Sequence, residues 1–139
     1  MLPLFTRRGE REVQGLMVKL LNNHSAELDA LIEGPRLEGR VRLCIPVVVI
    51  PMEEGQLHLE QAFAAVTKEF SSVGVSLVLC EPRGLDEAVL AFRYEREMRF
   101  VRGEARHLNP MGAGFYQIGF RLKELIHPGD YPELQEVHF

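Results

Sequence analysis

At 139 residues, the chain is long enough for one compact domain with a small appendage. Hydrophobic residues make up 46% and charged residues 26%, which is typical of a globular protein and excludes a disordered or fibrous chain. The net charge of −4 disfavours non-specific binding to a nucleic-acid backbone, although a local basic patch can still hold a small phosphate ligand. No apolar run is long enough to span a membrane and no signal peptide is evident, so we expect a cytoplasmic protein.

The N-terminal segment is expected to be helical. Between residues 10 and 32, apolar side chains recur at helical spacing and give one apolar stripe on an otherwise polar segment. Ser25 could begin a second short helix, so the segment is one helix or two, and Gly34 and Pro35 end it. The stripe could pack on its own domain, form a dimer or cover a missing domain, and composition does not choose among these.

After Arg40 the composition changes to short runs of valine, leucine, isoleucine and phenylalanine, separated by glycine, proline, aspartate and asparagine. This spacing is typical of all-β proteins, and we predict a six-stranded antiparallel barrel. Alternation of apolar residues is clear between residues 73 and 79. The predicted strands are Val41–Ile50, Leu59–Lys68, Gly74–Cys80, Ala88–Tyr94, Met98–Leu108 and Gly114–Leu122.

The predicted elements divide the chain into three parts. They are an N-terminal α-helical extension (residues 1–34), a β-barrel domain (residues 35–127) and an extended C-terminal tail (residues 128–139). One short helical turn is expected at the sequence KELI, residues 123–126, just before the proline-containing tail.

The sequence offers no template for catalysis. It contains no Gly-rich phosphate loop, no nucleophile elbow and no Cys/His spacing suited to zinc, and its histidines are scattered. Cys44 and Cys80 each lie inside an apolar run, where they are predicted to be buried and not to form a disulfide. We therefore expect no enzyme activity, no catalytic residue, no metal site and no cofactor.

The stretch FRYEREMRF, residues 92–100, interleaves aromatic residues with arginine, which is the composition of a platform for single-stranded nucleic acid. Glu95, Glu97 and Glu104 accompany these arginines, so the alternative is a hairpin with a charged, solvated face. The acidic residues favour the hairpin, and no nucleic-acid polymer is expected as a partner.

Two short motifs remain. Arg36 and Arg40 lie four residues apart in a linker that enters the first predicted strand, and EFSSVG, from Glu69 to Gly74, lies between the second and third strands. Each has a simpler explanation, because arginines keep a linker soluble and SSVG is a plausible tight turn.

Together, in this order, the two motifs resemble the PilZ domain, whose pattern is RxxxR before the first strand and D/N-x-S-x-x-G after the second. The stretches VRLCIPVVV, VGVSLVL and GFYQIGFRL resemble the first, third and sixth strands of that family. The resemblance extends from Arg36 to about Leu125 and implies a six-stranded barrel.

The resemblance implies binding of cyclic di-GMP, a bacterial second messenger with two phosphates and two guanines. Arg36 and Arg40 would share guanine and phosphate contacts, while Glu69 and Ser71 would hydrogen-bond a guanine edge and Gly74 would supply backbone freedom. A guanidinium suits this ligand because it can bind phosphate or guanine in bidentate fashion and can stack on a base. Ordering of the linker could then reorient the helical extension.

Two positions qualify this implication. The Asp or Asn of the family is Glu69 here, which keeps a carboxylate but adds one methylene. In this family an arginine directly before the first motif arginine favours a stacked pair of ligands, so the resemblance implies one bound ligand where Pro35 stands. A receptor would relay the signal to a partner in motility, biofilm formation or transcription. The alternative is a ligand-free adaptor of the same fold, in type IV pilus or flagellar machinery, whose N-terminal helix binds a protein partner or itself.

Overall fold

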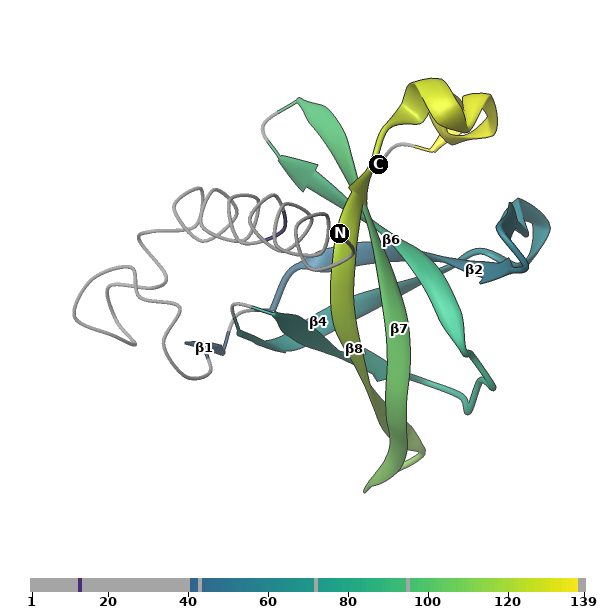
Figure 1. The fold of residues 1–139 in the computed structure, drawn as a ribbon. Coiled ribbons are helices and arrows are strands. Elements are labelled where there is room, and N and C mark those ends of the chain that lie inside the picture. The colour runs from purple at the N-terminus through teal and green to yellow at the C-terminus, as the bar shows by residue number, and fades with distance from the viewer. Residues whose placement is uncertain (1–12, 14–40, 43, 72, 95, 138–139) are drawn as a thin grey trace, which may run out of the picture.

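The computed structural model describes residues 13, 41–42, 44–71, 73–94 and 96–137 (Figure 1). Three short 3-10 helices are present, at Leu59–Gln61 (η1), Pro128–Asp130 (η2) and Pro132–Glu136 (η3). The strands are Val41–Arg42 (β1), Pro46–Glu53 (β2), Gln56–Leu57 (β3), Phe63–Phe70 (β4), Gly74–Leu79 (β5), Glu87–Tyr94 (β6), Glu97–Gly112 (β7) and Phe115–Ile126 (β8).

All strand pairings are antiparallel, and the strands follow one another in the order β1-β4-β5-β8-β7-β6-β2-β3. The strand β4 also pairs with β2, so β2, β4, β5, β8, β7 and β6 close into a barrel of six strands. Two short strands lie outside this closed ring: β1 pairs with β4, and β3 pairs with β2. The predicted all-β, six-stranded antiparallel barrel is therefore confirmed.

Alternating side chains fill the barrel interior. Val75, Leu77 and Leu79 on β5 are buried, whereas the residues between them are half-buried, as the two-residue period predicted. Ile118 on β8 belongs to the same core cluster. Val13 is helical and is also buried in this cluster. It is the only described residue of the predicted N-terminal extension, whose other residues lie outside the described part of the chain.

The strand β2 is buried on both faces, which explains its uninterrupted apolar run. Val47 and Val49 point into the barrel, while Ile50 and Met52 belong to a second cluster together with Leu134 of η3. The C-terminal 3-10 helices thus cover the outer face of β2 and β6.

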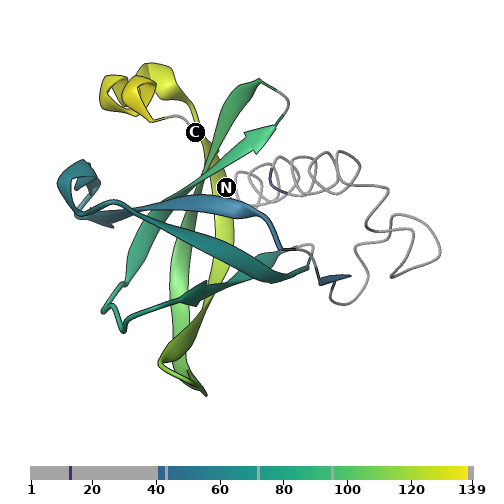
Figure 2. The ribbon, with the colours of Figure 1, turned by 180° about the vertical axis from the view of Figure 1, so that it is seen from behind.

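The C-terminal segment was expected to be extended, and this prediction is wrong because it folds into η2 and η3. These turns lie beside the β2–β3 hairpin in both views (Figures 1 and 2). The hydroxyl of Tyr131 donates a long hydrogen bond of 3.5 Å to the carbonyl oxygen of Gly55 in that hairpin. Burial of Leu134, with 1% of its surface exposed, holds the segment against the barrel.

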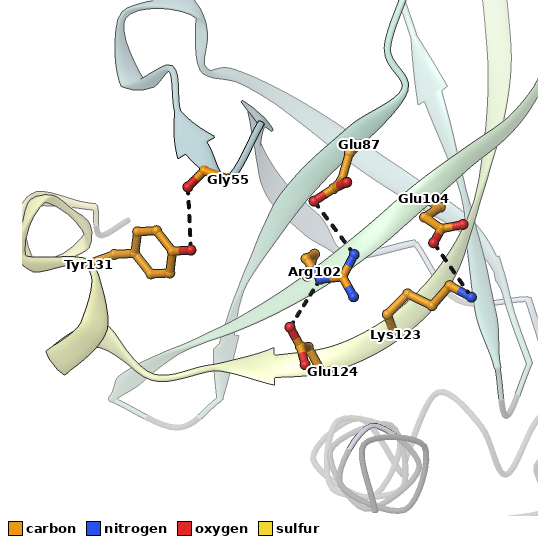
Figure 3. A network of polar contacts seen from close by, with 7 residues as sticks. All are labelled: Gly55, Glu87, Arg102, Glu104, Lys123, Glu124 and Tyr131. Carbon is orange, nitrogen blue, oxygen red and sulfur yellow. Dashed lines mark hydrogen bonds and ion pairs between the residues drawn. The ribbon is translucent and has the colours of Figure 1, made fainter. Parts of the chain in front are cut away.

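The helical turn expected at residues 123–126 is also wrong, because β8 continues through this stretch along β7. Leu125 pairs with Val101, and Glu124 pairs with Arg102. Figure 3 shows Arg102 between two carboxylates, 3.1 Å from Glu124 and 3.5 Å from Glu87. Pairing with a neighbouring strand therefore overrides the local preference of the sequence.

The first predicted strand is interrupted between β1 and β2. Both strands pair with β4, and between them the hydroxyl of Thr67 accepts a hydrogen bond of 2.9 Å from the backbone N–H of Ile45. The second predicted strand begins later than expected, since its first residues form η1. Cys44 and Cys80 are free, as predicted, but exposed rather than buried. Each adjoins an inward-pointing neighbour, so alternation turns the thiols outward.

Within the described residues, no helix has the length and apolar character needed to cross a membrane.

Candidate functional site

The outer face of the barrel is hollowed where β4, β5, β8 and β7 lie side by side. The cavity has a volume of about 410 Å³, which is within the range of small-molecule sites. This hollow is called the β5–β8 pocket below. It is lined by Glu69, Phe70, Ser71, Val73, Gly74, Val75, Ser76, Arg106, His107, Asn109, Gln117, Gly119, Phe120 and Arg121.

Three of the five residues predicted to bind a ligand, Glu69, Ser71 and Gly74, therefore line one hollow. Arg36 and Arg40 lie outside the described residues. The described chain resumes at β1, where Arg42 pairs directly with Glu69 of β4. The chain that leaves the arginine linker thus enters the sheet at the edge of the β5–β8 pocket.

Small residues form the floor of the pocket. Ser76 on β5 pairs with Gly119 on β8, and both face outward because the residues flanking them point into the barrel. Among the described residues, a Cβ atom built on Gly119 would meet only the Cβ of Arg106, at 4.0 Å. The absence of bulk at these two positions leaves the surface hollow.

A bulge in β4 shapes one wall. The register between β4 and β5 shifts between Thr67 and Glu69, so Lys68 is the extra residue. Its ammonium group donates a hydrogen bond of 3.0 Å to the side-chain oxygen of Gln117, across β5. This contact bounds the pocket on the side opposite the turn at Ser71.

A second bulge, in β7, shapes the facing wall. The register between β7 and β8 shifts between residues 105 and 108, so that Arg106 and His107 both lie opposite the single residue Gly119. A bulge bends its strand and redirects side chains. It brings both of these side chains to the pocket lining.

Ser71 has a structural task in the turn between β4 and β5. Its hydroxyl oxygen accepts hydrogen bonds from the backbone N–H groups of Gly74, at 3.1 Å, and Val73, at 3.4 Å. The backbone N–H of Ser71 donates to the carbonyl oxygen of Gly74 at 2.9 Å. The tight-turn explanation of SSVG is therefore correct, and it coexists with the position of Ser71 in the pocket.

Gly74 is required by a close approach of two strands. A Cβ atom at this position would lie 2.8 Å from the backbone carbonyl oxygen of Phe120 on β8. The φ angle of Gly74 is not positive, so the expected conformational freedom is not the reason for glycine here. Steric space beside the β8 backbone is the reason.

The charged residues of the pocket lining are Glu69, Arg106 and Arg121, with His107 beside them. With two arginines and one glutamate, the pocket lining has a net charge of +1, whereas the net charge of the whole chain is −4. The side-chain oxygen of Ser76 is shielded from solvent and has no hydrogen-bond partner among the residues that the structure describes. The pocket thus offers guanidinium donors, a carboxylate acceptor and an unsatisfied hydroxyl on its floor.

Neither Arg106 nor Arg121 was identified from the sequence as a ligand-binding residue. Arg106 reaches the pocket lining through the bulge in β7, which has no clear sequence signature. The only available signal was a pair of arginines on two strands of one predicted hairpin.

The other candidate sites are not formed. Phe92 and Phe100 are 0% and 3% exposed, so their rings cannot stack on nucleic-acid bases. In the same hairpin, Arg99 pairs with Glu97 at 2.6 Å, as expected for a charged solvated face. Among the described residues, no three His, Cys, Asp or Glu side chains are arranged to hold a metal ion.

No family of known proteins and no curated protein matches the sequence. Among solved structures, the chain is similar to the Bacillus subtilis inhibitor of motility (MotI/DgrA), with a TM-score of 0.50 and 16% sequence identity. The match covers 75% of this chain and 49% of the other, so the chain spans about half the length of this neighbour. At this level of identity the similarity concerns the fold alone.

Proposed function

We propose that the chain is a non-catalytic, PilZ-like regulator that binds cyclic di-GMP in the β5–β8 pocket. The observation that carries the proposal is the convergence of Glu69, Ser71 and Gly74 on one hollow that two arginines also line. Its volume of about 410 Å³ suits part of a dinucleotide, while the remainder would be covered by the arginine linker.

The chemistry of the ligand matches the polar groups available. The carboxylate of Glu69 can accept hydrogen bonds from the N1 and N2 groups of a guanine. Guanidinium groups can bind phosphate oxygens in bidentate fashion. The longer side chain of Glu69 would move the guanine outward by about one methylene relative to the family pattern.

The connection between the linker and the pocket supports a role for Arg36 and Arg40. Arg42 pairs with Glu69, and Arg40 precedes it by only two residues. Since two residues of chain span at most about 7 Å, a side chain at position 40 is within reach of the pocket edge. Contacts of both arginines with the ligand would couple binding to the N-terminal segment that precedes them in the chain.

A second candidate function is a ligand-free adaptor that binds another protein. The observation that favours it is a group of exposed apolar side chains near the tip of the β7–β8 hairpin, which projects beyond the rest of the barrel (Figure 1). They are Leu108, Met111 and Phe115, with 36%, 43% and 47% of their surfaces exposed. Apolar surface of this kind is common where proteins meet.

Isothermal titration calorimetry with cyclic di-GMP tests the receptor function. The wild-type chain should give saturable heat, the Arg40→Ala variant should lose it, and GTP should give none. The loss in the variant should exceed tenfold in Kd, since charge-assisted contacts contribute about 1.5–3 kcal/mol each. Absence of heat with the wild-type chain at any reachable concentration would contradict the receptor and favour the adaptor.

A further inference from the structure

We infer that Arg106 on β7 and Arg121 on β8, which both line the β5–β8 pocket, form a phosphate subsite there. The inference deepens the proposed function and rests on it, because it assigns one end of the bound dinucleotide to residues outside both sequence motifs. It also predicts the orientation of the ligand, with a guanine edge at Glu69 and a phosphate at Arg106.

The strand register arranges the relevant residues in one row across the sheet. Glu69 on β4 pairs with Ser76 on β5, and Ser76 pairs with Gly119 on β8. The β7 bulge then places Arg106 and His107 opposite Gly119. The row therefore runs from an acidic wall, over a floor of small residues, to a basic wall.

The length of this row favours an elongated ligand. Four adjacent strands are separated by three spacings of about 4.8 Å, or about 14 Å from the backbone of β4 to that of β7. Side chains reach inward from both walls and shorten the gap. A ligand with a guanine edge at one end and a phosphate at the other can contact both walls, whereas inorganic phosphate can contact only one.

Arg106 differs from several other arginines of the barrel surface in its surroundings. Arg83 and Arg102, for example, are paired with carboxylates, Arg83 at 2.6 Å from Glu81 and Arg102 at 3.1 Å from Glu124. Within the described part of the chain, Arg106 has no acidic partner. A guanidinium beside a hollow and without a carboxylate partner is available to bind an anion.

Ser76 supplies a second, independent indication of a ligand. Its hydroxyl oxygen is shielded from solvent on the pocket floor and has no hydrogen-bond partner within the described part of the chain. Buried polar groups in proteins are nearly always hydrogen-bonded, and an exception calls for an explanation such as a bound molecule. Rotation of the Ser76 side chain toward the pocket would let a phosphate oxygen or a ligand hydroxyl satisfy it.

The test compares Arg106→Gln and Arg121→Gln with Arg96→Gln by calorimetry with cyclic di-GMP. Arg96 is exposed, belongs to the β6–β7 turn and does not line the pocket, so it is the matched control. Each pocket variant should bind about 10- to 100-fold more weakly than the control, as expected for loss of a charge-assisted contact. Thermal melting of each variant verifies that the barrel is intact, and Arg106→Lys gives a second, milder change at the same position.

Inorganic pyrophosphate, titrated separately, distinguishes failure of the subsite from failure of the proposed function. Tight binding of cyclic di-GMP by all folded variants would overturn the subsite and leave the receptor function standing. Binding of pyrophosphate that requires Arg106, without binding of cyclic di-GMP, would support the phosphate subsite and overturn the proposed ligand. Binding of neither compound by the wild-type chain would overturn both.

Discussion

The backbone carbonyl of Phe120 lies so close to Gly74 that a Cβ atom on residue 74 would be 2.8 Å from the carbonyl oxygen. The glycine of the E-x-S-x-x-G motif is therefore needed to pack β5 against β8. Ser71 of the same motif caps the turn between β4 and β5. Substitutions at these two positions alter the barrel as well as any ligand contact, so they are poor tests of binding.

Gly74→Ala should destabilise the barrel by about 1–3 kcal/mol, because the added methyl group must displace the backbone of β8. Urea denaturation, followed by circular dichroism, measures the change. Gly119→Ala is the matched control, since the one described atom within 4.0 Å of its Cβ is the Cβ of Arg106, and it should change the free energy of unfolding little. Equal effects of the two variants would contradict the steric explanation.

Ser71→Ala should cost about 1 kcal/mol of folding free energy, the typical net value of a hydrogen bond. The hydroxyl accepts from the N–H of Gly74 at 3.1 Å, and alanine leaves this group unpaired in the turn. Ser71→Thr retains the hydroxyl and should recover most of the loss. A threonine variant no more stable than the alanine variant would argue against the capping role.

Gly119→Val should fill the pocket floor without unfolding the protein. The position faces outward and has space for a side chain, and valine suits a β-strand. Binding of cyclic di-GMP should fall at least tenfold while the melting temperature stays close to that of the wild type. Gly84→Val is the control, because Gly84 is exposed and a Cβ there meets nothing within 4 Å. Unchanged affinity in the Gly119 variant would place the ligand elsewhere.

Leu134→Ala should destabilise the protein by about 2–5 kcal/mol, because Leu134 is 1% exposed and fills the cluster on the outer face of β2 and β6. The C-terminal segment should also become more sensitive to limited proteolysis. Leu134→Met conserves the volume and should cost less than about 1.5 kcal/mol. A proteolysis pattern identical to that of the wild type would mean that Leu134 does not hold the segment in place.

His58→Ala should raise the pKa of Glu60, measured by a carbon-13 NMR titration of the side-chain carboxyl group. A backbone hydrogen bond and then the hydrogen bond from His58 lower the pKa of Glu60 in the wild type. Only the second is lost in the variant, so the rise should be partial. Because the pKa of Glu60 is lower in the folded than in the unfolded state, its ionised carboxylate stabilises the fold at pH values above the ordinary glutamate pKa. This stabilisation is lost as the pH falls through the folded-state pKa. No rise in the variant would contradict this pairing.

Local patterns in the sequence were sufficient to predict the barrel. Alternation between residues 73 and 79, and the turn chemistry of SSVG, correctly gave β5 and the turn before it, because both depend on neighbouring residues. Residues 123–126 and the C-terminal segment were mispredicted because their conformations depend on distant partners. Glu124 pairs with Arg102, and Leu134 packs on a sheet face formed by β2 and β6, which lie far earlier in the chain.

The candidate site was predictable only in part, for the same reason. Glu69, Ser71 and Gly74 fall within one short motif, and the structure brings all three to one hollow. Arg106 reaches that hollow through a bulge whose register is set by pairing with β8. The shape of the floor depends on the pairing of Ser76 with Gly119, which lie on different strands.

The central claim is that cyclic di-GMP binds in the β5–β8 pocket, and a proton–nitrogen NMR titration of the labelled full chain tests it most directly. The predicted result is saturable shifts of the backbone amides of Ser71, Ser76 and Gly119, with GTP giving none and the amide of Gly84 unmoved. Shifts confined to other parts of the barrel, or no shifts at millimolar ligand, would contradict the claim.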